Sequence, residues 1–110
     1  MKQYVIDQLR EYDYEKILEF LKNNADASEL GDIFWVTLPV ELYSDIQREH
    51  KQCHPFCFAV NLSFSQVDFE LLTRSRRILR CACISYAHGK QRDYIMDYAD
   101  RMLEELNIRI

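Results

Sequence analysis

The sequence predicts an α+β fold in the order β-α-β-α-β-β-β-α, with a mainly antiparallel sheet covered by helices. Two observations support this class. Apolar and polar residues alternate over several short segments, which is typical of strands, and the segments after Asp13 and after Lys90 repeat apolar residues at helical spacing. Only two glycines and two prolines interrupt the 110 residues, so we expect regular elements joined by short connections.

The first half of the chain predicts a strand, a helix and a second strand. Residues 4–9 form a short mixed segment that we assign to a strand. Asp13 is a suitable N-cap, and apolar residues recur after it at helical spacing until Asn23. Residues 33–38 (IFWVTL) are apolar on both alternating faces, as expected of a central strand that is covered on both sides. We therefore expect Trp35 to be largely buried.

The second half predicts a helix, three strands and a closing helix. Pro39 suits the first turn of a helix, which should continue past His50 until Pro55 ends it. Three strands, expected to form an antiparallel meander, are assigned to residues 56–62, 67–71 and 78–87. The closing helix is predicted over residues 90–106, with an apolar stripe that can cover the sheet.

The length and charge of the chain favour one intracellular domain. A chain of 110 residues is long enough for one core and too short for two, so we expect a single domain over residues 1–110. The net charge of −4 attracts neither nucleic acid nor an anionic membrane, and no segment resembles a membrane span. Asp7 interrupts the region where a signal peptide needs its apolar run, so we expect a cytoplasmic protein with reduced cysteines.

All four cysteines and all three histidines lie between His50 and His88, in two groups. The first group is the candidate metal site, and its members are His50, Cys53, His54 and Cys57. Its first three members occupy positions i, i+3 and i+4, so they would point the same way on a helix. Thiolates and imidazoles are suitable ligands for zinc. The alternative is a polar helix end, with Cys57 as a small buried side chain.

The second group contains Cys81, Cys83 and His88. Its two cysteines would project from the same face of the strand predicted over residues 78–87. A pairing register centred near Arg76 would place Phe69 beside Cys83. Two cysteines on one face could share a metal, but we interpret both as packing residues beneath the closing helix. The sequence leaves open whether the two groups converge in space.

A local run of positive charge stands out in this acidic chain, formed by Arg74, Arg76, Arg77 and Arg80. Guanidinium groups can hold a phosphate or a carboxylate through paired hydrogen bonds, so these residues are a candidate anion site. No glycine-rich phosphate loop accompanies them, and charged turns also discourage edge-to-edge pairing of strands. The sequence favours an exposed turn and leaves the anion site as the alternative.

Two parts of the chain resemble known families. Residues 4–21 (YVIDQLREYDYEKILEFL) resemble the first strand and helix of acetyltransferases of the GNAT family. The glycine-containing loop that grips the coenzyme A pyrophosphate in that family is missing, so the resemblance implies no active-site residue here. Residues 69–87 (FELLTRSRRILRCACISYA) and 91–106 (QRDYIMDYADRMLEEL) look like a small bacterial family of no assigned function, which implies only a compact intracellular domain.

Three functions remain open from the sequence. The first, which we favour because no reaction motif is present, is a non-catalytic domain without a cofactor that acts through protein contacts, with itself as a homodimer or with a protein partner. The second is a zinc-binding protein or metal-dependent enzyme that uses the cluster of cysteines and histidines. The third is an acetyltransferase-like fold without a recognisable coenzyme A loop.

Overall fold

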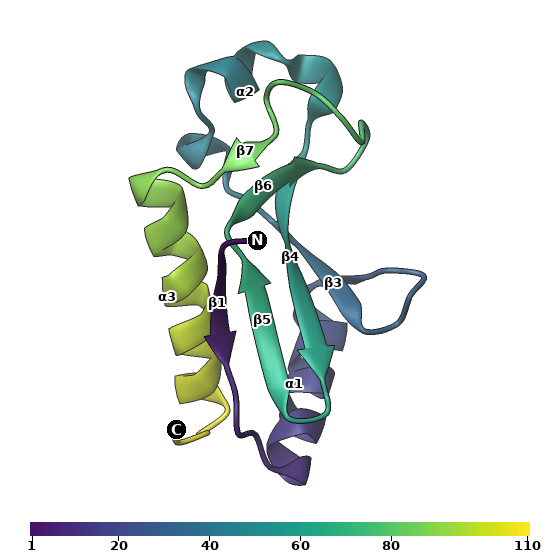
Figure 1. The fold of residues 1–110 in the computed structure, drawn as a ribbon, viewed down its shortest axis with the longest axis vertical. Helices are drawn as coiled ribbons and strands as arrows, with labels where there is room; N and C mark the ends of the chain where they lie inside the picture. The colour runs from purple at the N-terminus through teal and green to yellow at the C-terminus, as the bar shows by residue number, and fades with distance from the viewer.

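A computed structural model describes all residues from 1 to 110. It contains three α-helices and a seven-stranded sheet in which every pairing is antiparallel (Figure 1). The predicted α+β class is therefore confirmed. The strands are β1 (Gln3–Ile6), β2 (Asp26–Ala27), β3 (Ile33–Thr37), β4 (Phe56–Ser63), β5 (Gln66–Glu70), β6 (Leu72–Ser75) and β7 (Ser85–Tyr86). The main path through the sheet is β1-β5-β4-β3-β2, and β6 pairs with both β4 and β7.

Two long helices and one short helix complete the fold. They are α1 (Glu11–Asn24), α2 (Asp45–Glu49) and α3 (Gly89–Glu105). Single 3-10 turns flank α2, namely η1 (Val40–Leu42) before it and η2 (Lys51–Cys53) after it. No helix combines the length and apolar composition that a lipid bilayer span requires. In Figure 1, α2 and β7 lie together at one end of the molecule, beyond the end of β5.

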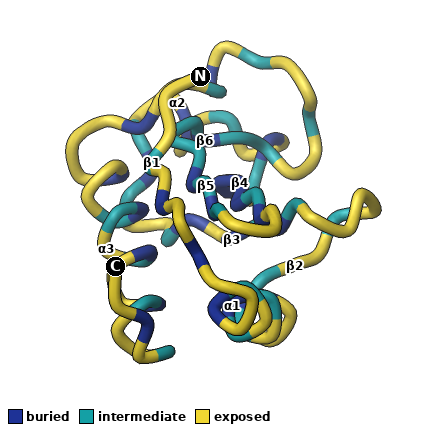
Figure 2. Tube along the Cα trace, turned by 60° about the horizontal axis from the view of Figure 1, so that its bottom comes forward, coloured by how far each residue is buried: buried dark blue, intermediate teal, exposed yellow.

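The main hydrophobic core lies between one face of the sheet and the two long helices, which share the same side of it (Figure 2). Alternate residues of the strands supply the sheet side of this core: Phe34 and Val36 on β3, Phe58 and Val60 on β4, and Val67 and Phe69 on β5. The helices contribute Ile17, Leu21, Ile95, Ala99 and Met102. The apolar residues that alternate along the strands therefore face the apolar residues that recur at helical spacing on the two long helices.

The opposite face of the sheet has no helix over it, which corrects one prediction. The segment that includes β3 is apolar on both faces, but only alternate residues are buried, Phe34 and Val36 in the main core and Leu38 in a smaller cluster. Trp35 lies on the open face and is half-buried, with the guanidinium carbon of Arg76 5.6 Å from its ring centroid. The expectation of a strand covered on both sides is therefore wrong for Trp35.

The strand predicted over residues 78–87 is also mostly wrong. Only β7 at its end pairs with another strand, and Leu79, expected on an apolar face, is 84% exposed. The third strand is instead β6, which pairs with the start of β4. Phe69 lies opposite residues of β1 and β4, so the predicted register beside Cys83 does not form.

Side chains replace strand partners in this segment, which gives the physical reason. The hydroxyl oxygen of Ser75 accepts the backbone N–H groups of Arg77 and Ile78 at 3.1 and 3.0 Å. The side-chain amide of Gln47 donates to the carbonyl of Cys83 at 3.3 Å. Because these side chains satisfy the backbone locally, residues 76–84 form a hydrogen-bonded loop, here called the cysteine loop.

The two helices that precede the cysteines differ from prediction at their ends. α1 begins at Glu11, and Asp13 lies one turn inside, where its carboxylate accepts the backbone N–H of Arg10 at 3.1 Å. α2 begins only after Ser44, whose hydroxyl accepts the N–H of Gln47, because η1 occupies the turn after Pro39. It ends before His50, so the helix does not carry the histidines and cysteines on one face.

Truncating two adjacent side chains of β3 should have unequal effects on stability. Phe34 is 1% exposed, and Phe34→Ala should lower the free energy of unfolding by about 3–5 kcal/mol because it leaves a cavity. Trp35→Ala should cost only about 1–2 kcal/mol, since water already reaches this side chain. Chemical denaturation of both variants measures the difference, and equal losses would contradict the assignment of Trp35 to the open face.

Candidate metal centre

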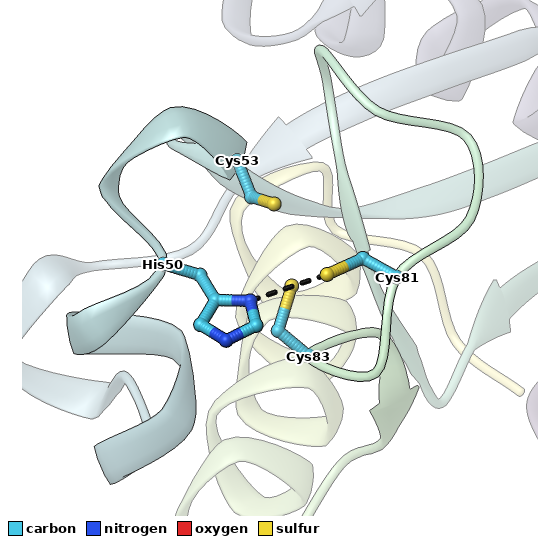
Figure 3. Close-up of side chains that lie close together, drawn as sticks. All are labelled: His50, Cys53, Cys81 and Cys83. Carbon is cyan, nitrogen blue, oxygen red and sulfur yellow. Dashed lines mark hydrogen bonds between the residues drawn. The ribbon is translucent and has the colours of Figure 1, made fainter.

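Four side chains from the two sequence groups meet at the end of the molecule that carries α2. They are His50, Cys53, Cys81 and Cys83, and their ligand atoms all lie within 4.8 Å of one another. Figure 3 shows the four side chains pointing toward a common centre, two from each segment. His50 Nδ1 lies 3.2 Å from the sulfur of Cys81, the contact marked by the dashed line. This arrangement could hold a metal ion.

Two tight turns present these ligands in pairs. His50 follows α2, and its carbonyl accepts the N–H of Cys53 at 2.9 Å, which closes the turn of η2. In the cysteine loop, the carbonyl of Cys81 accepts the N–H of Ile84 at 3.0 Å. Side chains within such a short turn lie close together. The first turn therefore places His50 beside Cys53, and the second places Cys81 beside Cys83. The two pairs are far apart in the sequence and come together only when the chain folds.

The site lies in a second, smaller hydrophobic cluster. Cys53 and Cys83 are 0% exposed, while His50 and Cys81 are half-buried. The buried cluster around the two inner cysteines contains Leu38, Tyr43 and Phe56. The N–H of Phe56 donates to the hydroxyl of Tyr43 at 3.1 Å, which fixes this wall. The ligands are therefore shielded on their inner side and reach solvent on the side of His50 and Cys81.

The protonation of the three clustered thiols is uneven. Hydrogen bonds from the backbone N–H and the thiol of Cys83, followed by one from His50, lower the pKa of Cys81 to about 6. Burial raises the pKa of Cys83 to about 12 and also raises the pKa of Cys53. The neighbours of Cys81 therefore favour its thiolate form, whereas burial favours the neutral thiol of Cys53 and of Cys83.

A buried hydrogen-bond network fixes the cysteine loop against α2 and α3. The fully buried amide of Gln47 donates to Thr73 Oγ1 at 2.8 Å and to the carbonyl of Cys83 at 3.3 Å. Its carbonyl oxygen accepts from Gln91 Nε2 and from the backbone N–H of Ser44, both at 2.9 Å. Every polar atom of the Gln47 side chain is therefore bonded, which a buried amide requires.

Two of the four residues predicted as metal ligands lie outside the group. His54 Nε2 contacts the carbonyl oxygen of Gln47 at 2.7 Å, and its ring packs edge-on against Tyr43 and Phe56. Cys57 lies on β4, and its thiol donates to the carbonyl of Arg74 at 3.6 Å. The residue types that the sequence singled out are the right ones for a metal, but the group takes only two members from each segment.

The cysteines of the cysteine loop take a different position from the one expected. Cys81 and Cys83 do not lie on a strand face beneath α3, although Cys83 is buried as predicted. The residue that reasoning from sequence missed is Gln47, and its place in the S-D-I-Q capping box is its only local signal. His88 precedes α3 as its N-cap and does not join the group.

The arginine run divides into two kinds of environment. Arg74 pairs with Glu70 and Arg76 with Asp26, each at 3.0 Å. Arg77 and Arg80 are exposed and form no ion pair. The run therefore forms an exposed turn in part, while its first two members are fixed by carboxylates.

Comparison with known proteins leaves the chain without an assigned family. No family model, curated protein or solved structure matches it. The resemblances to acetyltransferases and to a small bacterial family therefore stay predictions. What the cluster can do chemically follows from its own donor atoms, which are three sulfurs and one imidazole nitrogen.

Cys57 should be chemically inert in the folded protein. Burial raises the pKa of its thiol to about 11, so at pH 8 its thiolate fraction should be roughly a hundredfold lower than that of an exposed cysteine. Its alkylation by iodoacetamide should accelerate as the pH rises toward 11, and at pH 8 it should accelerate on unfolding. Peptide mass spectrometry reports the labelling, and fast native labelling at pH 8 would contradict the burial.

Removing the amide of Gln47 should destabilise the fold. Gln47→Ala leaves the buried amide of Gln91 and the hydroxyl of Thr73 without one partner each, so we expect a loss of about 2–4 kcal/mol. The matched control is Gln52→Ala in the exposed part of η2, which should change stability by less than about 0.5 kcal/mol. Urea denaturation measures both, and a neutral Gln47→Ala would show that the network is dispensable.

Proposed function

We propose that the protein is a small non-catalytic zinc-binding domain, in which His50, Cys53, Cys81 and Cys83 hold one zinc ion. The observation that carries the proposal is the approach of the four ligand atoms to within 4.8 Å of one another. Zinc at about 2.3 Å from sulfur and about 2.0 Å from nitrogen places tetrahedral ligands about 3.5–3.8 Å apart. Contraction by about 1 Å brings the group to that geometry, which side-chain rotation can supply.

The donor set favours zinc over the other common metals. Calcium and magnesium take oxygen ligands, and the group contains none. Thiolate and imidazole suit a soft or borderline ion, and tetrahedral sites of this composition hold zinc or iron. The low pKa of Cys81, which its hydrogen bonds from Cys83 and His50 produce, provides one ligand in the required thiolate form.

The number of ligands favours a structural site. Four protein ligands fill the tetrahedron of zinc and leave no position for a water molecule, whereas catalytic sites keep one position open. Two ligands lie in the small core that contains Tyr43 and Phe56, so the ion would complete this core. A domain of this kind acts through its surface, which agrees with the first expectation from the sequence. Its assembly as a homodimer remains a prediction, and light scattering after gel filtration measures it.

Zinc content should depend on one cysteine and not on another. Protein purified without a histidine tag should contain about one zinc ion per chain. Cys81→Ala should lose the ion, because a ligand is missing, and should unfold at a lower temperature. Cys57→Ala is the matched control, since this buried thiol lies outside the group, and it should keep the ion. Elemental analysis of the three proteins gives the answer.

Two results would overturn the zinc proposal. One is a native protein free of metal that also fails to take up cobalt(II) with the visible absorption of tetrahedral thiolate coordination. The other is equal metal content in Cys81→Ala and in the wild-type protein. If the Cys57→Ala variant and the His54→Ala variant each lost the metal, the ligands would instead be those first predicted from the sequence. If the protein contained iron in place of zinc, the assignment of the four ligands would stand and only the identity of the metal would change.

A further inference from the structure

A surface cavity of about 400 Å³ lies beside the start of the cysteine loop. Its wall is formed by the arginines Arg74, Arg76 and Arg77, by the apolar residues Trp35, Ile78, Leu79 and Ile84, and by Ser75. The wall combines positive charge with an aromatic and aliphatic surface. None of its residues belongs to the metal centre.

Two of the arginines are held in place by carboxylates. Arg74 uses Nε to bind Glu70, and Arg76 uses Nη1 to bind Asp26. Their side chains are 31% and 33% exposed, and the side chain of Asp26 is 68% exposed, so the pair of Arg76 with Asp26 lies at the surface. A guanidinium has five N–H donors in a rigid plane, and each pairing uses one of them. The remaining donors have no acceptor in the protein, and the guanidinium of Arg76 also lies 5.6 Å from the ring centroid of Trp35.

Arg77 supplies charge that no protein group neutralises. It forms no ion pair, and its backbone N–H is anchored to Ser75 Oγ at 3.1 Å. The cavity thus has one positive charge in excess of its two paired carboxylates, in a protein whose net charge is −4. Local positive charge in an acidic protein attracts small anions selectively, because large polyanions meet repulsion from the rest of the surface.

We propose that this cavity binds a small phosphate monoester with a flat apolar group. Guanidinium groups donate paired hydrogen bonds to phosphate oxygens, and a phosphate monoester offers three terminal oxygens to the three arginines, whereas a carboxylate offers two. Trp35 and the two isoleucines provide the surface for the apolar part. The proposed site uses none of the four metal-centre residues, although Ser75, which lines the cavity, donates to the carbonyl of Cys53 and so connects the two sites.

The sole tryptophan of the chain provides the measurement, because Trp35 lines the cavity. Titration of the protein as purified with phenyl phosphate should give a saturable change in tryptophan fluorescence. Arg77→Gln should weaken the binding about tenfold or more, because a charge-assisted hydrogen bond is lost. Arg80→Gln is the matched control, since Arg80 belongs to the same run and does not line the cavity, and it should leave the affinity unchanged.

Two further probes test the ligand class. Inorganic phosphate should bind more weakly than phenyl phosphate because it lacks the apolar group, and benzoate should bind more weakly because it offers two acceptor oxygens where a phosphate offers three. No saturable change with phenyl phosphate, or equal affinity in Arg77→Gln, would overturn the site. Equal affinity for benzoate would overturn the preference for phosphate. Because zinc content is measured separately, failure here and failure of the zinc proposal are distinguishable.

Discussion

The side-chain amide of Gln47 holds together the end of the molecule that carries the candidate metal centre. Apart from the N–H of Arg76, which donates to the carbonyl of Pro55, the cysteine loop has no strand partner, so its shape depends largely on hydrogen bonds from side chains. Gln47 connects three elements at once, because its partners lie on β6, in the loop and on α3. A buried amide with all its partners has one low-energy position, which is why a loop without regular structure can still place Cys83 accurately.

Local sequence patterns predicted most of the helices and strands whose backbone hydrogen bonds are made within the element or with a neighbouring strand. β4, β5 and α3 lie close to their predicted ranges, because alternation and helical spacing reflect burial on one side of an element. The same logic failed for residues 78–87. There the alternation of Leu79, Cys81 and Cys83 does not mark a strand, since the loop turns back and buries only some of these side chains.

The candidate site shows a similar division. The sequence named His50 and Cys53 among its candidate ligands because histidines and cysteines cluster there, although the helix expected to align them ends before His50. The sequence could not select Cys81 and Cys83 over His54 and Cys57, since that choice depends on how the chain returns from β6. The side chain of Ser75, which donates to the carbonyl of Cys53, lies at this return and belongs to no recognisable motif.

The two pairs of ligands come from parts of the chain separated by the β4–β5 hairpin and β6. An ion shared between them would act as a cross-link that closes a loop of roughly 30 residues, which in the chain-entropy picture restricts the unfolded ensemble by about 3–4 kcal/mol. The closed loop contains strand pairs of short sequence separation, such as Ser63 with Gln66, which can form early. The hairpin would then bring the distant ligands together, so metal capture would be a late step that slows unfolding more than it speeds folding.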